Sequence, residues 1–225
     1  MKMTTLKNKN DVIKLSPMAL RLYNELSHSI EEFAPSAAPN CSLFITDPLD
    51  QHLSIFLDLI SRTLQYLGYQ VQLSTAFKNE VDIAIGFNTP HCPSLFWIRP
   101  FAKDALLPIE KTATINENIF RFCLLQKHYR DPSVFSLMAI QNAQHHLQNL
   151  RLTVKSLLLQ GTSTPNAQAL ASYKQKLRGA LRQDFNFPSA LSILKDALRP
   201  GALSPGSQLS FAKEYQELFG LHWSL

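Results

Sequence analysis

Residues 116–158 most constrain the fold, because apolar side chains recur there at helical spacing over a long stretch. Pro132 divides the stretch, since proline lacks an N–H donor and moves the preceding residue out of the helical region. The first part places four side chains on one stripe: Phe120, Cys123, Leu124 and Lys127. The second repeats apolar residues at spacings of three, four and seven: Val134, Leu137, Met138, Leu147, Leu150, Val154, Leu157 and Leu158. The pattern predicts two helices, the second long and with one buried face that other elements must cover.

The first half of the chain predicts a small α/β layer. Residues 53–68 indicate a helix, because six apolar side chains share one face and Gly68 supplies a C-terminal stop. Short apolar runs around this helix are typical of buried strands: 41–46, 71–73, 81–86 and 95–98. Strand, helix and strand joined by short links imply a right-handed parallel crossover. Residues 18–33 fit a strand, a hairpin or a short helix, and the sequence leaves these three open.

After residue 160 the chain predicts three more helices. Thr164 is a suitable cap, and Pro165 a suitable first residue, for a helix to about Gln183. The apolar face of this helix is Ala167, Leu170, Ala171, Leu177 and Leu181. Asn186 is a plausible N-cap for residues 189–198, and Gly220 ends a last helix over 208–219. The fold class is therefore α/β plus all-α, with a loose arm at 1–17, an α/β domain at 18–112 and a helical bundle at 113–225.

Composition and charge restrict the class of protein. A hydrophobic fraction of 45% and a charged fraction of 17% suit a globular chain rather than a disordered one. We expect no membrane span, no secretory signal in residues 1–17 and a cytoplasmic location, where the 3 cysteines stay reduced. Residues 1–112 carry 10 Lys and Arg against 11 Asp and Glu, whereas residues 113–225 carry 12 against 6. This basic second half permits an acidic partner such as RNA but does not establish one.

Two groups of residues are candidate contact sites. Lys174, Arg178 and Arg182 recur every four residues and line one helical stripe, which suits either RNA phosphates or plain solvent. The tail after the last helix carries Leu221, Trp223 and Leu225, and it either folds back or docks on a partner. The sequence contains no P-loop, GxGxxG or GxSxG motif. We therefore predict no catalytic, cofactor-binding or metal-binding residues, no cofactor and no small-molecule substrate.

Four segments, in order, resemble cysteinyl-tRNA synthetase, a class I enzyme. Residues 22–35 resemble its opening segment, and residues 62–69 (RTLQYLGY) resemble the end of its first crossover helix. Residues 121–132 (RFCLLQKHYRDP) and 183–191 (QDFNFPSAL) resemble two segments of its helical region. The resemblance implies a reduced Rossmann-like α/β layer followed by a bundle like the synthetase's DALR-type helical domain.

The signature residues of that family are missing here. The family binds ATP through a HIGH motif after its first strand, whereas residues 47–58 here contain one histidine, His52. The KMSKS lysines have their nearest counterpart at residues 110–114, with the single Lys111. Without these groups the charge on the pentavalent phosphate lacks its stabilising partners.

The family's zinc site, built from two Cys, a His and a Glu, is also incomplete. Thr46 stands at the first Cys position, His91 matches the His, and Leu95 replaces the Glu. One ligand of four cannot hold zinc. The adjacent pair His145 and His146 does not replace it, because neighbouring helical residues point about 100° apart.

The resemblance and these losses imply a shortened, degenerate, non-catalytic paralogue. Its expected role is an interaction or adaptor subunit that binds other protein subunits in a larger assembly, such as a bacterial secretion complex or another multi-protein machine. The alternative is a tRNA- or RNA-binding protein that uses the basic helical half. A third possibility is a ligase with a rewired site.

Overall fold

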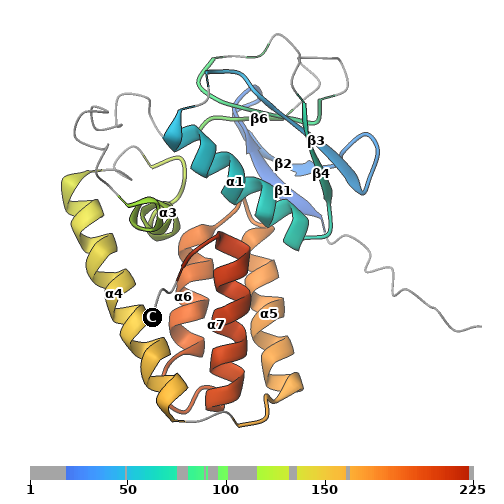
Figure 1. Ribbon diagram of the computed structural model, residues 1–225. Helices are drawn as coiled ribbons and strands as arrows, with labels where there is room; N and C mark the ends of the chain where they lie inside the picture. The colour runs from blue at the N-terminus through green and yellow to red at the C-terminus, as the bar shows by residue number, and fades with distance from the viewer. Residues whose placement is uncertain are drawn as a thin grey trace, which may run out of the picture.

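The computed structural model describes residues 19–48, 50–74, 81–88, 90, 96–100, 116–131, 136–160 and 163–222. Figure 1 shows an α/β layer at one end of the molecule and a bundle of long helices at the other. This arrangement confirms the predicted fold class. Within the ranges described, no helix has the length and apolar character needed to cross a bilayer.

The described chain begins with a hairpin, which is one of the three structures that the sequence left open. Strand β1 (Leu20–Asn24) pairs antiparallel with β2 (Ser29–Phe33), and Leu20 lies opposite Phe33. Burial alternates along β1, because Leu20 and Leu22 face the core while Arg21 faces outward. The hairpin therefore covers part of the core that the larger sheet and the bundle share.

A parallel sheet follows, and all of its predicted strands are confirmed. Its strands are β3 (Asn40–Ile45), β4 (Gln70–Ser74), β5 (Ile83–Ile85) and β6 (Phe96–Ile98), in the order β4-β3-β5-β6. Every neighbouring pair is parallel, as the strand–helix–strand pattern predicted. Since β4 and β5 flank β3 on opposite sides, the order of strands reverses between β3 and β5. In open α/β sheets, such a switch point is where ligands bind.

Helix α1 (Gln51–Tyr66) connects β3 to β4 and packs its apolar face against the core. It begins two residues before the predicted start, because the side chain of Asp50 accepts a hydrogen bond from the N–H of Leu53 and caps the helix. The chain leaves the helix through Gly68, whose φ of 102° favours glycine. Figure 1 shows α1 lying between the sheet and the ends of the bundle helices.

The second half of the chain is helical, as predicted. Its helices are α3 (Glu117–Gln126), α4 (Leu137–Leu159), α5 (Ala167–Leu181), α6 (Phe187–Ala197) and α7 (Pro205–Phe219). Asn186 caps α6 and Gly220 ends α7, which confirms both predictions. The prediction that Thr164 caps α5 was wrong, because Asn166 accepts the capping hydrogen bond from Ala169. Helix α7 also begins earlier than predicted, capped by Ser204.

The buried face of α4 differs from the predicted one at both ends. Leu137, Met138 and Leu158 are 64%, 71% and 46% exposed, so their assignment to the buried face was wrong. Ala139 and Ala143 lie in the interface with α3 instead, because small side chains let two helices approach closely. The middle of the prediction is confirmed by four buried residues: Leu147, Leu150, Val154 and Leu157. Val134 lies outside the described residues.

The α5 face needs a smaller correction. Leu170, Leu177 and Leu181 are buried as predicted, whereas Ala167 and Ala171 are exposed. Alanine buries so little area that its exposure costs little free energy.

One continuous core joins the sheet layer to the bundle. It extends from Leu22 of the hairpin through Phe56 of α1 to Phe211 of α7, all of which are fully buried. Trp97 of β6 is 6% exposed and packs with Ala84 in a small separate cluster. The predicted arm at 1–17 and the predicted boundary at residue 112 both lie outside the described residues.

Candidate functional site

The switch point between β3 and β5 is filled by a side chain of the protein itself. Asp47 follows β3, and its Oδ2 accepts hydrogen bonds from the N–H groups of Phe87 at 2.6 Å and Asn88 at 3.0 Å. Its Oδ1 accepts a third from the side-chain amide of Asn88 at 2.6 Å. The hydroxyl of Thr46 donates a fourth at 2.8 Å. An internal carboxylate thus takes the backbone donors that could hold a bound anion at this position.

Gly86 allows the two loops at this point to meet. Its φ is 148°, and a Cβ atom there would collide with the Thr46 hydroxyl and the Asp47 carboxylate. The N–H of Thr46 also bonds to the carbonyl of Ile85 at 3.0 Å, which continues the pairing of β3 with β5. The carboxyl ends of these strands are therefore closed against each other.

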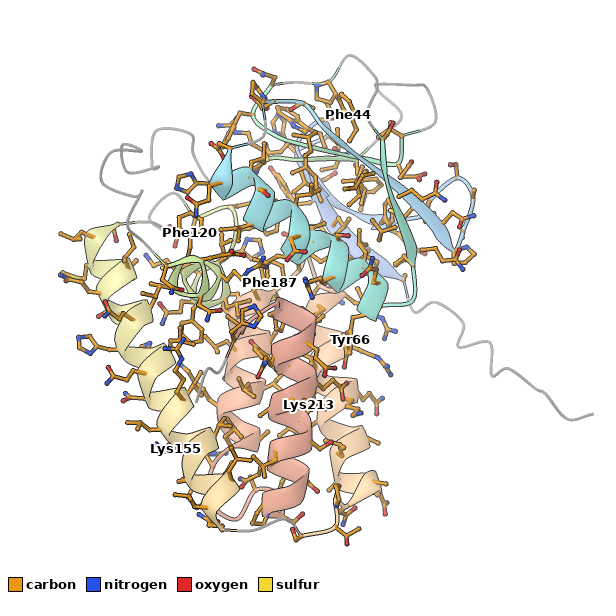
Figure 2. All side chains as sticks on the ribbon, viewed as in Figure 1. Phe44, Tyr66, Phe120, Lys155, Phe187 and Lys213 are labelled. Carbon is orange, nitrogen blue, oxygen red and sulfur yellow. The ribbon has the colours of Figure 1, made fainter. Side chains whose placement is uncertain are left out.

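The histidine that follows this loop is buried. His52 is 4% exposed, and its ring lies 4.5 Å from that of Phe120 in α3. Burial lowers the pKa of His52 more than the nearby Asp50 carboxylate raises it, so the neutral imidazole is favoured. Figure 2 shows Phe120 beneath the beginning of α1, where it packs with this ring.

Metal-binding side chains do not converge in the part of the chain described. No group of three or more His, Cys, Asp and Glu residues in those ranges is arranged to hold an ion. Cys41 is buried in β3, and burial together with the charge of Asp82 raises its thiol pKa to about 12. His91, Leu95 and Lys111, which the sequence assigned to the family's zinc and KMSKS regions, lie outside the described residues.

Asp184 forms a hub where the hairpin meets the bundle. Its Oδ1 accepts hydrogen bonds from the N–H of Tyr23 at 2.8 Å and from the hydroxyl of Tyr129 at 2.7 Å. Its Oδ2 accepts one from Arg130 at 2.7 Å and lies 3.4 Å from His128 Nε2. Burial alone would raise the pKa of this carboxyl, but the hydrogen bonds outweigh burial and hold the pKa below its ordinary value.

The hub brings three of the resembling segments together. Tyr23 comes from residues 22–35, Arg130 from 121–132 and Asp184 from 183–191. The Arg130 guanidinium also lies 4.2 Å from the centre of the Tyr23 ring. These shared residues therefore fasten the α/β layer to the bundle.

A second ionic cluster supports the same junction from α1. Arg121 of α3 reaches Asp58 of α1 at 2.5 Å, and its side chain is 9% exposed. Arg62 pairs with the same carboxylate at 2.9 Å and donates to the carbonyl of Glu217 in α7 at 3.0 Å. Figure 2 shows Phe187 at the start of α6 beneath α1, within the same contact region.

The predicted basic stripe lies along the contact of α5 with α1 and α7. Lys174 pairs with Glu214 of α7 at 2.5 Å, and the Arg178 guanidinium lies 5.1 Å from the centre of the Tyr66 ring. The hydroxyl of Tyr66 donates to Glu214 at 2.9 Å, and the carbonyl of Arg182 accepts a hydrogen bond from Arg21 of the hairpin. The first two cations of the stripe thus have partners within the protein.

The tail after α7 turns back onto the bundle as far as it is described. Leu221 is 1% exposed, so its side chain belongs to the core. His222 bonds to Asn118 of α3 through both its N–H and its carbonyl, each at 2.9 Å. Trp223 and Leu225, the rest of the candidate docking tail, lie outside the described residues.

A groove between α4, α6 and the start of α7 was not predicted from the sequence. It encloses about 800 Å³, and its walls include Leu150, Leu157, Lys195 and Leu203. His146 also lines it, with Nδ1 lying 2.6 Å from the Gln126 side chain. Because the groove is formed by elements that are distant in sequence, the sequence predicts the helices that line the groove but not the groove itself.

Comparison with known proteins finds similarity to cysteine–tRNA ligases. The enzyme of Chlorobaculum tepidum is 35% identical over 81 residues, which are 36% of this chain and 16% of the ligase. That of Streptococcus equi subsp. zooepidemicus is 28% identical over 111 residues, or 48% of this chain and 24% of the ligase. The enzyme of Rubrobacter xylanophilus is 28% identical over 120 residues, which are 50% of this chain and 26% of the ligase. No family model matches the chain.

The matched part of the chain thus spans between about a sixth and a quarter of each of these ligases. These matches agree with the resemblance carried by the four sequence segments. Over part of its length the chain is therefore similar to cysteine–tRNA ligases.

Proposed function

We propose that the chain is a non-catalytic relative of cysteine–tRNA ligases that serves as an interaction subunit of a larger protein assembly. The observation that carries this proposal is the closed switch point, where the Asp47 carboxylate accepts four hydrogen bonds from Thr46, Phe87 and Asn88. A nucleotide phosphate placed there would meet a negative charge instead of unoccupied N–H donors. This geometry opposes formation of an aminoacyl adenylate.

The surroundings of the switch point support the same proposal. The single histidine between Asp47 and Asp58 is His52, which is buried against Phe120 rather than directed at a ligand. The residues that the chain shares with the ligase segments include Tyr129, Arg130 and Asp184, and these hold the two layers together. A rigid scaffold with a closed crevice can act through its surface.

We further propose that its partners are other protein subunits and that the assembly is cytoplasmic. A bacterial secretion complex or another multi-protein machine fits this role. The uneven charge of the chain, with 12 Lys and Arg against 6 Asp and Glu in residues 113–225, suits an acidic partner surface.

Two measurements test this function. The chain is expected to show no ATP binding by calorimetry and no cysteine-dependent exchange of pyrophosphate into ATP. A tagged chain expressed at its native level is expected to purify with a fixed ratio of specific protein subunits. Clear pyrophosphate exchange, or recovery only as a free monomer, would overturn the proposal.

RNA binding is a second candidate, favoured by the basic character of residues 113–225. It predicts binding to bulk tRNA that weakens steeply with salt, because phosphate contacts release counterions. Reversal of Lys174, Arg178 and Arg182 to Glu would then weaken all RNA sequences alike. Since Lys174 and Arg178 also have internal partners, reversal of the exposed Lys176 and Lys213 is the necessary second variant. Absence of tRNA binding at low salt would eliminate this candidate.

A further inference from the structure

The groove beside α4 follows that helix over much of its length. Its α4 wall extends from His146 to Gln160, and the other walls come from α6, the loop after it and the start of α7. With a rise of 1.5 Å per residue, the α4 wall is roughly 21 Å long. The groove is therefore about as long as four turns of an α-helix.

The floor of the groove is apolar, and one edge is polar along its whole length. Leu150, Leu157, Leu198 and Leu203 are between 5% and 8% exposed and form an aliphatic floor. The polar edge follows α4 at spacings of four, three and four: Asn149, Thr153, Ser156 and Gln160. The hydroxyls of Thr153 and Ser156 donate to carbonyls of α4 itself, so their oxygens remain available to accept hydrogen bonds. A helix can place apolar side chains on the floor and polar ones at this edge.

The charged side chains that line the groove are basic. They are Lys195 and Arg199, and none of the lining residues is Asp or Glu. Arg199 is ion-paired with Asp196 outside the groove, while the Lys195 side chain is exposed. Burial, Lys195 and His145 lower the pKa of His146, so its neutral imidazole is favoured and the positive charge at this end is that of Lys195. An occupant with carboxylates beside its apolar row would complement this charge.

We propose that this groove is the docking site for an amphipathic helix of a partner protein. The helix inserts apolar side chains at i, i+3 or i+4 and i+7 over the leucine floor, and it places Asp or Glu next to Lys195. The inference rests on the proposed interaction role, and it adds the surface and the chemistry of the partner. The lining contains no Phe, Tyr or Trp on which RNA bases could stack. The lysine-rich residues 1–17 have the wrong charge to be the occupant.

The test places a photo-crosslinking amino acid in the full-length chain in the cells from which it comes. Ser156, an exposed residue at the groove edge, is replaced in one variant, and Gln148, an exposed α4 residue outside the groove, in the matched control. The expected result is a protein adduct at Ser156 but not at Gln148. Mass spectrometry should place this adduct in a helical segment with acidic residues beside an apolar row.

A charge variant tests the same contact by affinity. With the crosslinked partner purified, Lys195→Glu is expected to weaken binding by about five- to tenfold. Lys155→Glu, which reverses an exposed α4 charge outside the groove, is expected to change the affinity by less than about twofold. Equal losses in both variants would contradict specific recognition at the groove.

The outcomes separate this inference from the proposed function. Protein partners that crosslink only through other surfaces would overturn the groove assignment and leave the interaction role in place. Lipid or RNA adducts at Ser156 would overturn the assignment of a helical protein occupant. No protein adduct at either position, together with a chain that purifies as a free monomer, would overturn both proposals.

Discussion

Removal of the Asp184 carboxylate tests whether the hub holds the two layers together. In Asp184→Ala the buried hydroxyl of Tyr129 and the N–H of Tyr23 lose their acceptor, and Arg130 loses its counter-ion. Breaking a buried pair by removing one partner costs about 3–5 kcal/mol. The lower end applies, because the Arg130 side chain is 35% exposed and regains water.

The backbone at Asp184 adds a second contribution. Its φ is 54°, a left-handed conformation that Asp and Asn tolerate better than Ala. We expect about 1 kcal/mol from this source, and therefore a total loss of about 4 kcal/mol in the free energy of unfolding for Asp184→Ala. Asp184→Asn keeps the backbone preference and one acceptor oxygen, so we expect it to lose about 2 kcal/mol.

Urea unfolding at pH 7, followed by far-UV circular dichroism and by tryptophan fluorescence, measures these losses. The matched control is Asp196→Asn, which makes the same chemical change at a half-exposed carboxylate on α6 that bonds to Tyr173 and Arg199, and it should shift the midpoint far less than Asp184→Asn does. Because one core joins the layers, both probes are expected to report the same transition in the unmodified chain. A loss below about 1 kcal/mol in Asp184→Ala would refute the reasoning about the hub.

The pH dependence gives an independent check on the same group. The pKa of Asp184 is lower in the folded chain than its ordinary value, so its stabilisation is present above the unfolded pKa of about 3.9. That stabilisation is lost as the pH falls through the lower folded pKa. The difference between the unmodified chain and Asp184→Asn should therefore stay constant from pH 7 to about 5 and shrink below about 4. A difference that grows on acidification would contradict the assigned direction.

Three further predictions follow from single sites. Burial raises the thiol pKa of Cys41 and of Cys123 to about 12, so iodoacetamide at pH 8 should modify neither until urea unfolds the chain, as peptide mapping would show. Gly220→Ala should lower the free energy of unfolding by about 1–2 kcal/mol, because its φ is 61° and a Cβ there would crowd the Arg121 guanidinium. Asp47→Ala should lower the same quantity by about 1–3 kcal/mol by leaving backbone donors unpaired, and an unchanged urea midpoint would count against the closed switch point.

The elements that the sequence predicted well depend on local signals. The four strands and α1 follow from short apolar runs and from a helical apolar face between turn residues. Asn186 and Gly220 were found because caps act within one turn of their own helix. The N-terminal bounds of α1, α5 and α7 were missed, since Asp50, Asn166 and Ser204 each compete with neighbouring residues that could also cap.

The sites could not be predicted in the same way, because they depend on contacts between distant residues. Tyr23 and Asp184 are separated by 161 residues, and their hydrogen bond has no local signal. Leu137 and Met138 match a helical repeat, which predicted that they are buried. Because Ala139 and Ala143 form the contact with α3 instead, the side chains of Leu137 and Met138 lie at the surface. The groove likewise appears only when α4, α6 and α7 are placed together.

Sequence similarity to an enzyme can persist at residues that hold the parts of its fold together. In this chain the resembling segments meet at Asp184 and Arg130, whereas the switch point beside β3 is closed by the Asp47 carboxylate. A ligand site needs donors that remain unpaired until the ligand arrives, but these donors already have a partner. The groove along α4 is the opposite case, with an aliphatic floor and Lys195 exposed at its rim. The physical contrast between a filled crevice and an open groove is therefore the reason to look for this protein's activity on its helical surface.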